Sequence, residues 1–320
     1  MKITTLPYRY EDIETNERIS YEDAKKLCFP KIDKMPIPKT HIGQLKLFFS
    51  ELHFLTKCSK MKDGTILYVG AACGYHVNYL AKMFPKMMFE LWDPSKFEVD
   101  ETKNVKIYNR FFNDGTAKMY KNRKNLLFVC DMRNLDIATT LKNNLIDKNT
   151  KNDVTDKIIM KDMVDQARWA KIMQPKFSHL KFRIPYANDI QDKKYYIKYL
   201  PGKLYLQNYY SYGLEMRLLT NEYNKYVDYE CKEIDEHNAS FILCTKNFIK
   251  SIYWKDIMKK NNILNIFDNA LALSICEYYL RKKYRRNVKD QEVVDLFLDV
   301  INFHVNKYGN KIRSVVFEKK

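Results

Sequence analysis

Short apolar runs alternate with helical stripes along residues 41–220, a pattern typical of an α/β fold. Buried strands are predicted where apolar residues are continuous or alternate with polar ones, at 65–69, 87–92, 104–108, 126–130, 177–184, 203–207 and 212–220. Helices are predicted where apolar residues recur every three or four positions, at 41–58, 77–84 and 155–173. We expect the first helix to pack on the sheet and Thr155 to cap the third.

The first strand ends in a turn that contains Gly70 and Gly74, which permit a tight bend and close approach of a ligand. The helix that follows points its free N–H groups at this turn. Asp93 ends the second strand about 20 residues later, where an acid in a doubly wound sheet accepts hydrogen bonds from ribose hydroxyls. An ordinary strand-loop-helix has the same outline. Because Gly-x-Gly-x-x-Gly is absent, S-adenosylmethionine suits the turn better than NAD.

The chain divides into three predicted parts. Residues 1–40 are polar and contain four prolines, which indicates an arm that lies over the domain. Residues 41–230 hold the predicted sheet, interrupted by a loop at 142–153 that is rich in Asn, Lys and Asp. Residues 231–320 combine Asn/Lys-rich connections with two helices, near 263–279 and 290–305, and form a helical, basic C-terminal extension.

Lys and Arg outnumber Asp and Glu by 56 to 39, which gives a formal net charge of +17. Such an excess favours a polyanionic partner, nucleic acid before membrane, although a lysine-rich proteome would produce the same bias. The run from Arg281 to Arg286 concentrates this charge around Tyr284. It is either a solvated helix end or a contact with RNA or an acidic partner.

Seven cysteines form no Cys-x-x-Cys pair, and several lie in apolar runs, so we expect free thiols in a reducing compartment. The histidines form no His-x-x-x-His or Cys/His cluster, so no metal site is predicted. No signal peptide is recognisable, and no apolar stretch approaches the length of about 18 residues that a membrane span needs. We expect a soluble, cytoplasmic protein without a membrane partner.

Four charged residues occupy positions where an apolar side chain would be less costly: Lys46, Asp131, Lys181 and Glu215. Unpaired burial of a charge is expensive, so we expect these side chains to meet at the ligand-binding edge of the sheet. A lysine that is crowded by a second cation and partly desolvated can accept a proton at neutral pH. A plain ion pair is the commoner explanation of any single member, and only the joint pattern points to catalysis.

Five segments carry a family resemblance, namely 43–47, 68–74, 131–133, 180–186 and 214–219. In order and spacing they resemble the RNA 2′-O-methyltransferases with a Lys-Asp-Lys-Glu tetrad. Within that group they resemble the poxvirus family of cap-specific mRNA (nucleoside-2′-O-)-methyltransferases that also serve as poly(A) polymerase regulatory subunits. The match covers residues 41–220 and is weak beyond residue 230.

The resemblance implies a Rossmann-like, S-adenosylmethionine-dependent methyltransferase sheet with flanking helices. It also implies transfer of a methyl group to the ribose 2′-hydroxyl of the first transcribed nucleotide, with Lys181 as general base and Lys46, Asp131 and Glu215 completing the tetrad. The implied cofactor-binding residues are Gln44, Tyr68, Gly70, Gly74, Asp93 and Phe112, with a core role as the alternative for Phe112. Cys73 replaces a proline that the family has in the glycine turn.

The resemblance further implies that a 7-methylguanine cap is stacked between two aromatic rings, a cation–π arrangement. Tyr186 matches one ring, and Tyr21 is a candidate for the other. The other positions that match cap-site or RNA-facing residues are Arg183, Asn188 and Tyr212. Asn188 replaces a family acid, and Glu236 is only a candidate for a second acid. The implied partners are capped mRNA and a poly(A) polymerase catalytic subunit, in the host cytoplasm or virion.

Other functions give different patterns. An adenine amino-methyltransferase would carry Asp/Asn-Pro-Pro-Tyr where Asp131-Met132-Arg133 stands, and the glycine turn disfavours an NAD dehydrogenase. Two alternatives stay open: a non-catalytic RNA-binding subunit of a poly(A) polymerase, and a 2′-O-methyltransferase with a non-cap RNA target. The complete tetrad favours an enzyme, since a protein that only binds RNA has little use for all four charges.

Overall fold

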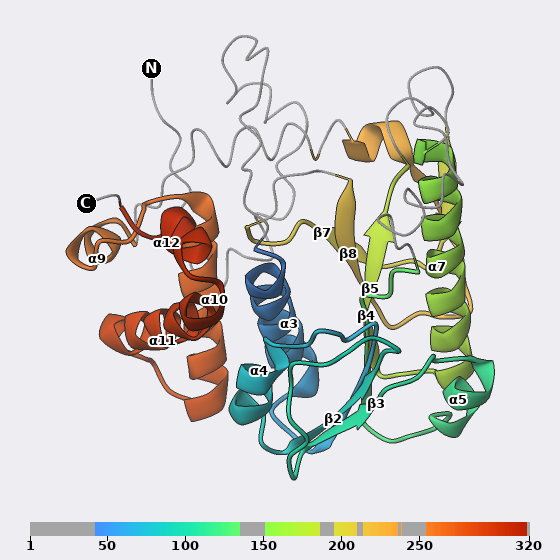
Figure 1. Cartoon of the computed structure of the whole chain (residues 1–320), viewed down its shortest axis with the longest axis horizontal. Helices are drawn as coiled ribbons and strands as arrows, with labels where there is room; N and C mark the ends of the chain where they lie inside the picture. The colour runs from blue at the N-terminus through green and yellow to red at the C-terminus, as the bar shows by residue number, and fades with distance from the viewer. Residues whose placement is uncertain are drawn as a thin grey trace. The chain divides into compact units, whose positions relative to one another are not determined.

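The computed structural model describes residues 42–134, 151–185, 195–209, 214–235, 238 and 254–318. The chain folds into two compact units, coloured by residue number in Figure 1. The sheet unit comprises Lys62–Tyr205 and Leu214–Asp235. The helical unit comprises Met1–Met61, Leu206–Gly213 and Glu236–Lys320.

The sheet unit is built on seven strands in the order β3-β2-β1-β4-β5-β8-β7. Their bounds are β1 Gly64–Val69, β2 Met87–Trp92, β3 Val105–Tyr108, β4 Leu126–Cys130, β5 Phe177–Arg183, β7 Lys203–Tyr205 and β8 Glu215–Thr220. Strands β1 to β5 are parallel, and β8 pairs antiparallel with both β5 and β7. This is the Rossmann-like α/β architecture that the sequence predicts. In such a sheet ligands bind beyond the carboxyl ends of the strands, where the order reverses between β1 and β4.

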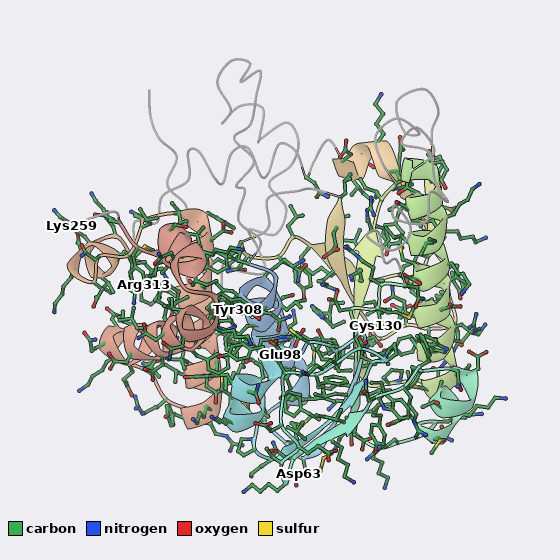
Figure 2. The ribbon with its side chains drawn as sticks, in the orientation of Figure 1. Asp63, Glu98, Cys130, Lys259, Tyr308 and Arg313 are labelled. Carbon is green, nitrogen blue, oxygen red and sulfur yellow. The ribbon has the colours of Figure 1, made fainter. Side chains whose placement is uncertain are left out.

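The predicted strands agree closely with the observed ones, and β2 and β4 match residue for residue. All five residues of β4 are buried, and the strand ends at Cys130, labelled in Figure 2. The sequence analysis missed a second, two-stranded antiparallel sheet of β6 (Tyr196–Tyr199) and β9 (Val227–Glu230). Only alternate residues of β6 are buried, and β9 is exposed or half-buried, so neither strand forms an apolar run.

Among the elements whose bounds the structure describes, the helices of the sheet unit are α4 (Val77–Met83), α5 (Asp114–Met119) and α7 (Lys151–Met173). Helix α7 packs on β5 and buries the predicted stripe of Ile159, Met163, Ala167 and Ala170. It begins at Lys151, so the prediction that Thr155 caps it, and that 151–153 belong to a loop, was wrong. Thr155 is instead buried inside the helix. The short α5, capped by the Asn113 side chain, was not predicted.

The helical unit contains α3 (Gly43–Ser59), α9 (Lys255–Lys260), α10 (Phe267–Tyr284), α11 (Asp290–Tyr308) and α12 (Asn310–Val316). Helix α3 packs against α10 and α11. The ring centroids of Phe48 and His304 are 5.5 Å apart, and those of Phe49 and Phe297 are 6.2 Å apart. The large apolar side chains of α3 thus contact the C-terminal helices, and the prediction that α3 belongs to the methyltransferase domain stays a prediction.

None of the helices in the described ranges is both long and apolar enough to cross a bilayer. Within the same ranges, no group of His, Cys, Asp and Glu side chains is arranged to hold a metal ion.

The turn after β1 packs closely against the end of β4. Gly70 has a φ of +76°, and a Cβ atom placed on it would lie 2.4 Å from the backbone nitrogen of Met132. The backbone nitrogen of Asp131 donates to the Val69 carbonyl oxygen at 2.9 Å. Only glycine satisfies both the dihedral angle and the space at this position.

We therefore predict that Gly70→Ala lowers the free energy of unfolding by roughly 2–4 kcal/mol, through left-handed backbone strain and displacement of residues 131–132. Gly115→Ala is the control, because a Cβ there meets only a side-chain atom, Asn113 Oδ1, at 3.1 Å. We expect the control to change the stability by less than about 1 kcal/mol. Denaturant unfolding measures both, and equal effects would contradict the close approach of the turn to β4.

Candidate active site

Asp93 directs its carboxylate toward the glycine turn. Its Oδ2 accepts a hydrogen bond from the backbone N–H of Ala72 at 3.2 Å, and its Oδ1 accepts one from Ser95 at 2.8 Å. Asn109 follows β3 and donates from Nδ2 to the carbonyl oxygens of Asp93 at 2.9 Å and Ser95 at 2.7 Å. The acid predicted to bind a ribose is therefore held beside the turn at the carboxyl edge of the sheet.

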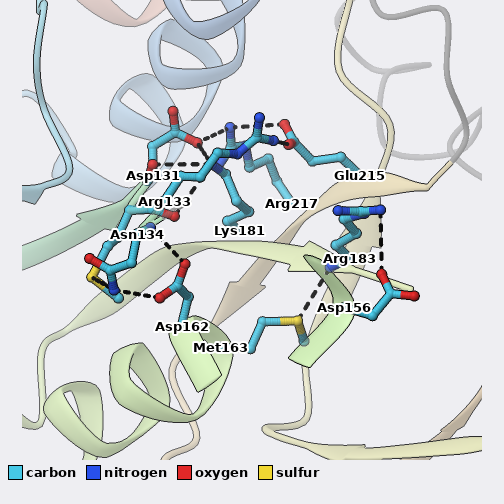
Figure 3. Close-up of polar contacts among 11 residues, drawn as sticks. Asp131, Arg133, Asn134, Asp156, Asp162, Met163, Lys181, Arg183, Glu215 and Arg217 are labelled. Atoms are coloured by element: carbon cyan, nitrogen blue, oxygen red, sulfur yellow. Dashed lines mark hydrogen bonds and ion pairs between the residues drawn. The ribbon is translucent and has the colours of Figure 1, made fainter. Parts of the chain in front are cut away.

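Lys181 and Arg217 share the carboxylate of Asp131 (Figure 3). Lys181 Nζ lies 2.8 Å from Asp131 Oδ1, and Arg217 Nη2 lies 2.7 Å from the same oxygen. Lys181 Nζ also donates to the backbone carbonyl oxygen of Asp131 at 3.1 Å. Both cations are buried, with 8% of Lys181 and 1% of Arg217 exposed. The end of β4 is thereby joined to β5 and β8.

Glu215 joins this cluster through arginines. Its Oε1 lies 3.6 Å from Arg217 Nη2, and its Oε2 accepts a hydrogen bond from Arg133 Nη2 at 3.1 Å. In the β5–β8 register, Lys181 is paired with Arg217, so the two side chains lie on one face of the sheet. The cluster of Asp131, Lys181, Glu215, Arg217 and Arg133 has three cations and two carboxylates, and so carries one excess positive charge.

The three cations of this cluster differ in what they can do with a proton. Burial by itself lowers the pKa of Arg217, but the attraction of Asp131 and then Glu215 outweighs burial and raises the pKa above its usual value. Guanidinium groups stay charged at any pH at which proteins fold. Lys181 is the one amine among these three cations, and an amine can act as a proton acceptor when it is neutral.

A pocket opens beside Lys181 between α7 and β5. Its lining residues are Met132, Arg133, Ile159, Asp162, Met163, Gln166, Lys181 and Arg183. Asp162 accepts a hydrogen bond from the backbone N–H of Asn134 at 3.0 Å, and burial raises the pKa of its carboxyl group. Arg183 Nη2 lies 3.5 Å from Asp156 on α7. The pocket thus combines an apolar wall from α7 with charged groups that can bind a polar ligand.

Two residues predicted to bind a cofactor are buried. Tyr68 is 1% exposed in β1, and its ring centroid lies 6.2 Å from that of His76. Phe112 is also buried, with its ring 5.0 Å from Trp169 and 5.5 Å from Trp92 in edge-to-face contacts. These contacts account for Phe112 as a core residue without a ligand, which is the alternative that its sequence context left open.

The structure brings together three of the four predicted tetrad residues, Asp131, Lys181 and Glu215. Lys46 and Gln44 lie on α3 in the helical unit, so their roles in catalysis and cofactor binding stay predictions. The remaining predicted positions lie outside the described residues: Tyr21, Tyr186, Asn188, Tyr212 and Glu236.

Sequence reasoning missed Arg217 and Arg133. Arg217 stands between Met216 and Leu218 in β8, two residues after Glu215 and so on the same face. The argument that selected Glu215, a charge inside an apolar strand, applies equally to Arg217. Arg133 is half-exposed and lies just past β4, so it carries no such signal.

Comparison with known proteins identifies relatives over most of the chain. The model of the family described as poly A polymerase regulatory subunit matches residues 5–304. The cap-specific mRNA (nucleoside-2′-O-)-methyltransferases of Myxoma virus strains Lausanne and Uriarra are each 26% identical over 280 residues, which covers 82% of this chain and 72% of the relative. The protein of the same name from Fowlpox virus strain NVSL is 28% identical over 234 residues, covering 68% of this chain and 67% of the relative.

The two arginines allow a matched test of the cluster. Arg217→Met removes a fully buried charge that Asp131 and Glu215 share, so we expect the free energy of unfolding to fall by about 3 kcal/mol or more. Arg133→Met removes a side chain that is 48% exposed, so we expect a loss below about 1 kcal/mol. Urea unfolding measures both changes, and a loss for Arg217→Met as small as that for Arg133→Met would contradict this description of the cluster.

Proposed function

Because the chain belongs to the poly(A) polymerase regulatory subunit family, we propose that it is a cap-specific mRNA 2′-O-methyltransferase. It transfers a methyl group from S-adenosylmethionine to the ribose 2′-hydroxyl of the first transcribed nucleotide, the activity that its Myxoma virus and Fowlpox virus relatives are named for. The observation that carries the proposal is the position of Lys181. This residue is buried at the carboxyl edge of the sheet, where it forms an ion pair with Asp131 next to Arg217.

The residues around the glycine turn fit S-adenosylmethionine. A Cβ atom on Gly74 would lie 2.9 Å from the Ala71 carbonyl oxygen, so the turn is as close-packed as a cofactor cradle requires. The Asp93 carboxylate beside it suits ribose hydroxyls. With Tyr68, Gly70 and Gln44, these residues would hold the cofactor. When bound, the cofactor supplies a methyl group on a positively charged sulfur, which is open to attack by an oxygen nucleophile.

Lys181 takes the proton from the ribose 2′-hydroxyl. A neutral lysine amine has two N–H groups, and Asp131 provides acceptors for both, Oδ1 at 2.8 Å and the backbone oxygen at 3.1 Å. The nitrogen lone pair then remains free for the hydroxyl proton. Arg217 stays charged and keeps Asp131 in place. The family resemblance assigns Lys46 as the fourth member of the tetrad.

The nucleotide next to the cap lies over the mouth of the small pocket between α7 and β5. Lys181 and Arg183 line this pocket, so a ribose over its mouth meets the general base, and the exposed Arg133 suits a phosphate. Tyr186 and Asn188 follow β5 within a few residues of Arg183 and bind the cap, with Tyr186 stacked on 7-methylguanine. Tyr21 and Tyr212 complete this site.

A role as a regulatory subunit accompanies the enzymatic one. The family description supports a poly(A) polymerase catalytic subunit as a partner. A subunit that only bound RNA would have no use for a lysine and an arginine buried together on one carboxylate, because that arrangement is costly to fold. The cluster therefore favours an active enzyme over a non-catalytic binding protein.

The general base can be tested by substitution. Lys181→Arg keeps the positive charge but cannot be deprotonated, so we expect methyl transfer to a short capped RNA to be lost while S-adenosylmethionine binding is retained. Lys161→Arg, on the exposed face of α7, is the control and keeps full activity. Radiolabel transfer and calorimetry measure the two quantities. Activity of Lys181→Arg within about tenfold of wild type would remove Lys181 as the base.

Cap recognition can be tested at Tyr186. Methylation places a positive charge on the guanine, and stacking of a desolvated cation on an aromatic ring contributes about 1–2 kcal/mol. We therefore expect Tyr186→Ala to weaken binding of a methylated cap dinucleotide roughly tenfold, while Tyr186→Phe keeps the affinity. Fluorescence titration at fixed salt, with methylated and unmethylated caps, measures the selectivity.

If wild type binds both caps equally, the RNA target lies elsewhere than the cap. If Tyr186→Ala lowers the melting temperature and weakens the binding of all RNAs by the same factor, Tyr186 is a core aromatic residue.

A further inference from the structure

The end of helix α10 carries a basic patch that methyl transfer does not use. We define the α10 terminal patch as Lys282, Lys283, Tyr284, Arg285 and Arg286. All five residues are exposed, with 48% of Tyr284 open to solvent. They belong to the helical unit, and none of them lies in the cluster around Asp131.

Aromatic rings hold the cations of this patch in place. Lys283 Nζ lies 5.2 Å from the ring centroid of Tyr284 and 5.5 Å from that of Tyr279. The Arg286 guanidinium lies 5.2 Å from the Tyr284 centroid. These are cation–π distances, so the positive charges are gathered around an exposed ring rather than free to move apart.

Most of the charge in the patch is not neutralised. Arg286 pairs with Glu292, at 2.5 Å and 3.0 Å, and its hydrogen bonds lower the pKa of that carboxyl group to about 2. In the described part of the chain no carboxylate lies within ion-pair distance of Lys282, Lys283 or Arg285. Three cations are thus available to a ligand, and a base that stacks on the half-exposed Tyr284 ring takes the place of Lys283 or Arg286 over it.

Helix stability alone does not account for this arrangement. Cations in the last turn of a helix interact favourably with its dipole, which explains Lys282 and Lys283. Arg285, however, is the C-cap residue and has a left-handed φ of 54°. Glycine or asparagine ends a helix more favourably in that conformation, because a larger side chain is strained there. An arginine at this position therefore makes the helix end less stable but adds a positive charge to the surface. Such a trade is expected where the surface binds a negatively charged ligand.

We propose that the α10 terminal patch binds single-stranded RNA, with its cations on the phosphates and Tyr284 stacked on a base. Nucleic acids alternate charged phosphates with flat bases, and a patch that alternates cations with an aromatic ring matches both. An acidic protein segment would satisfy the cations but would offer no flat partner to the exposed tyrosine. The site is sequence-tolerant, since every base has a face that can stack. It binds uncapped RNA and does not depend on methyl transfer.

The salt dependence of RNA binding tests the cations. We would compare wild type with the triple variant Lys282→Gln, Lys283→Gln, Arg285→Gln, using an uncapped oligouridylate of about 12 nucleotides and fluorescence anisotropy. Each phosphate contact contributes about 0.7 to the slope of log affinity against log salt for single strands, so the slope should fall by about 2.

The control removes the same charge from another helix of the same unit. Lys255, Lys259 and Lys260 of α9 are exposed, and Lys259 projects from the surface in Figure 2. The triple glutamine variant of these lysines should change the slope by less than about 0.5. If both triple variants changed the slope equally, RNA binding would depend only on the overall charge of the protein, and the proposal would be wrong.

Stacking is tested separately at Tyr284. We expect Tyr284→Ala to weaken oligouridylate binding roughly tenfold, whereas Tyr284→Phe keeps it, because stacking needs the ring and not the hydroxyl. Thermal melting and methyl transfer to a capped dinucleotide check that each variant is folded and are expected to be unchanged. If the patch variant keeps its RNA affinity but loses binding to polyglutamate, the patch binds an acidic protein, and the proposal is wrong.

Discussion

One carboxylate oxygen, Oδ1 of Asp131, receives two buried cations from neighbouring strands, Lys181 at 2.8 Å and Arg217 at 2.7 Å. Loss of this carboxylate would leave two buried charges poorly compensated, which is costly. The two ion pairs join the end of β4 to β5 and β8, and Gly70 approaches Met132 at the same edge of the sheet. The same contact fixes where Lys181 meets the pocket beside α7. The geometry of the site therefore follows from the need to neutralise charge at one edge of the sheet.

The cluster places a guanidinium and an amine on one carboxylate oxygen. Arg217, whose pKa is raised by Asp131 and Glu215 against the effect of burial, supplies a fixed charge. Lys181, on the same carboxylate oxygen, is an amine, the type of group that the proposed reaction needs as a base. Glu215 contacts the two arginines of the cluster, Arg217 and Arg133.

Sequence reasoning recovered the sheet and the charged residues because both leave local signals. Apolar runs located β1 to β5, and Asp131, Lys181 and Glu215 each stand at or inside such a run. Arg217 carries the same signal as Glu215, a charged residue inside the apolar strand β8, but it was not among the predicted site residues. What could not be predicted depends on distant partners: an amphipathic stripe shows that α3 packs, but not that α10 and α11 are its partners. Likewise an aromatic residue such as Phe112 looks the same whether it contacts a cofactor or Trp92 and Trp169.

The most direct test of the account is the position of the methyl group that wild-type protein transfers. A short capped RNA is incubated with labelled S-adenosylmethionine, digested with nucleases, and the labelled nucleotide is identified. The account predicts that the label lies on the 2′-oxygen of the first transcribed nucleotide. Label on a base, or no transfer by folded protein that binds both the cofactor and the RNA, would contradict it.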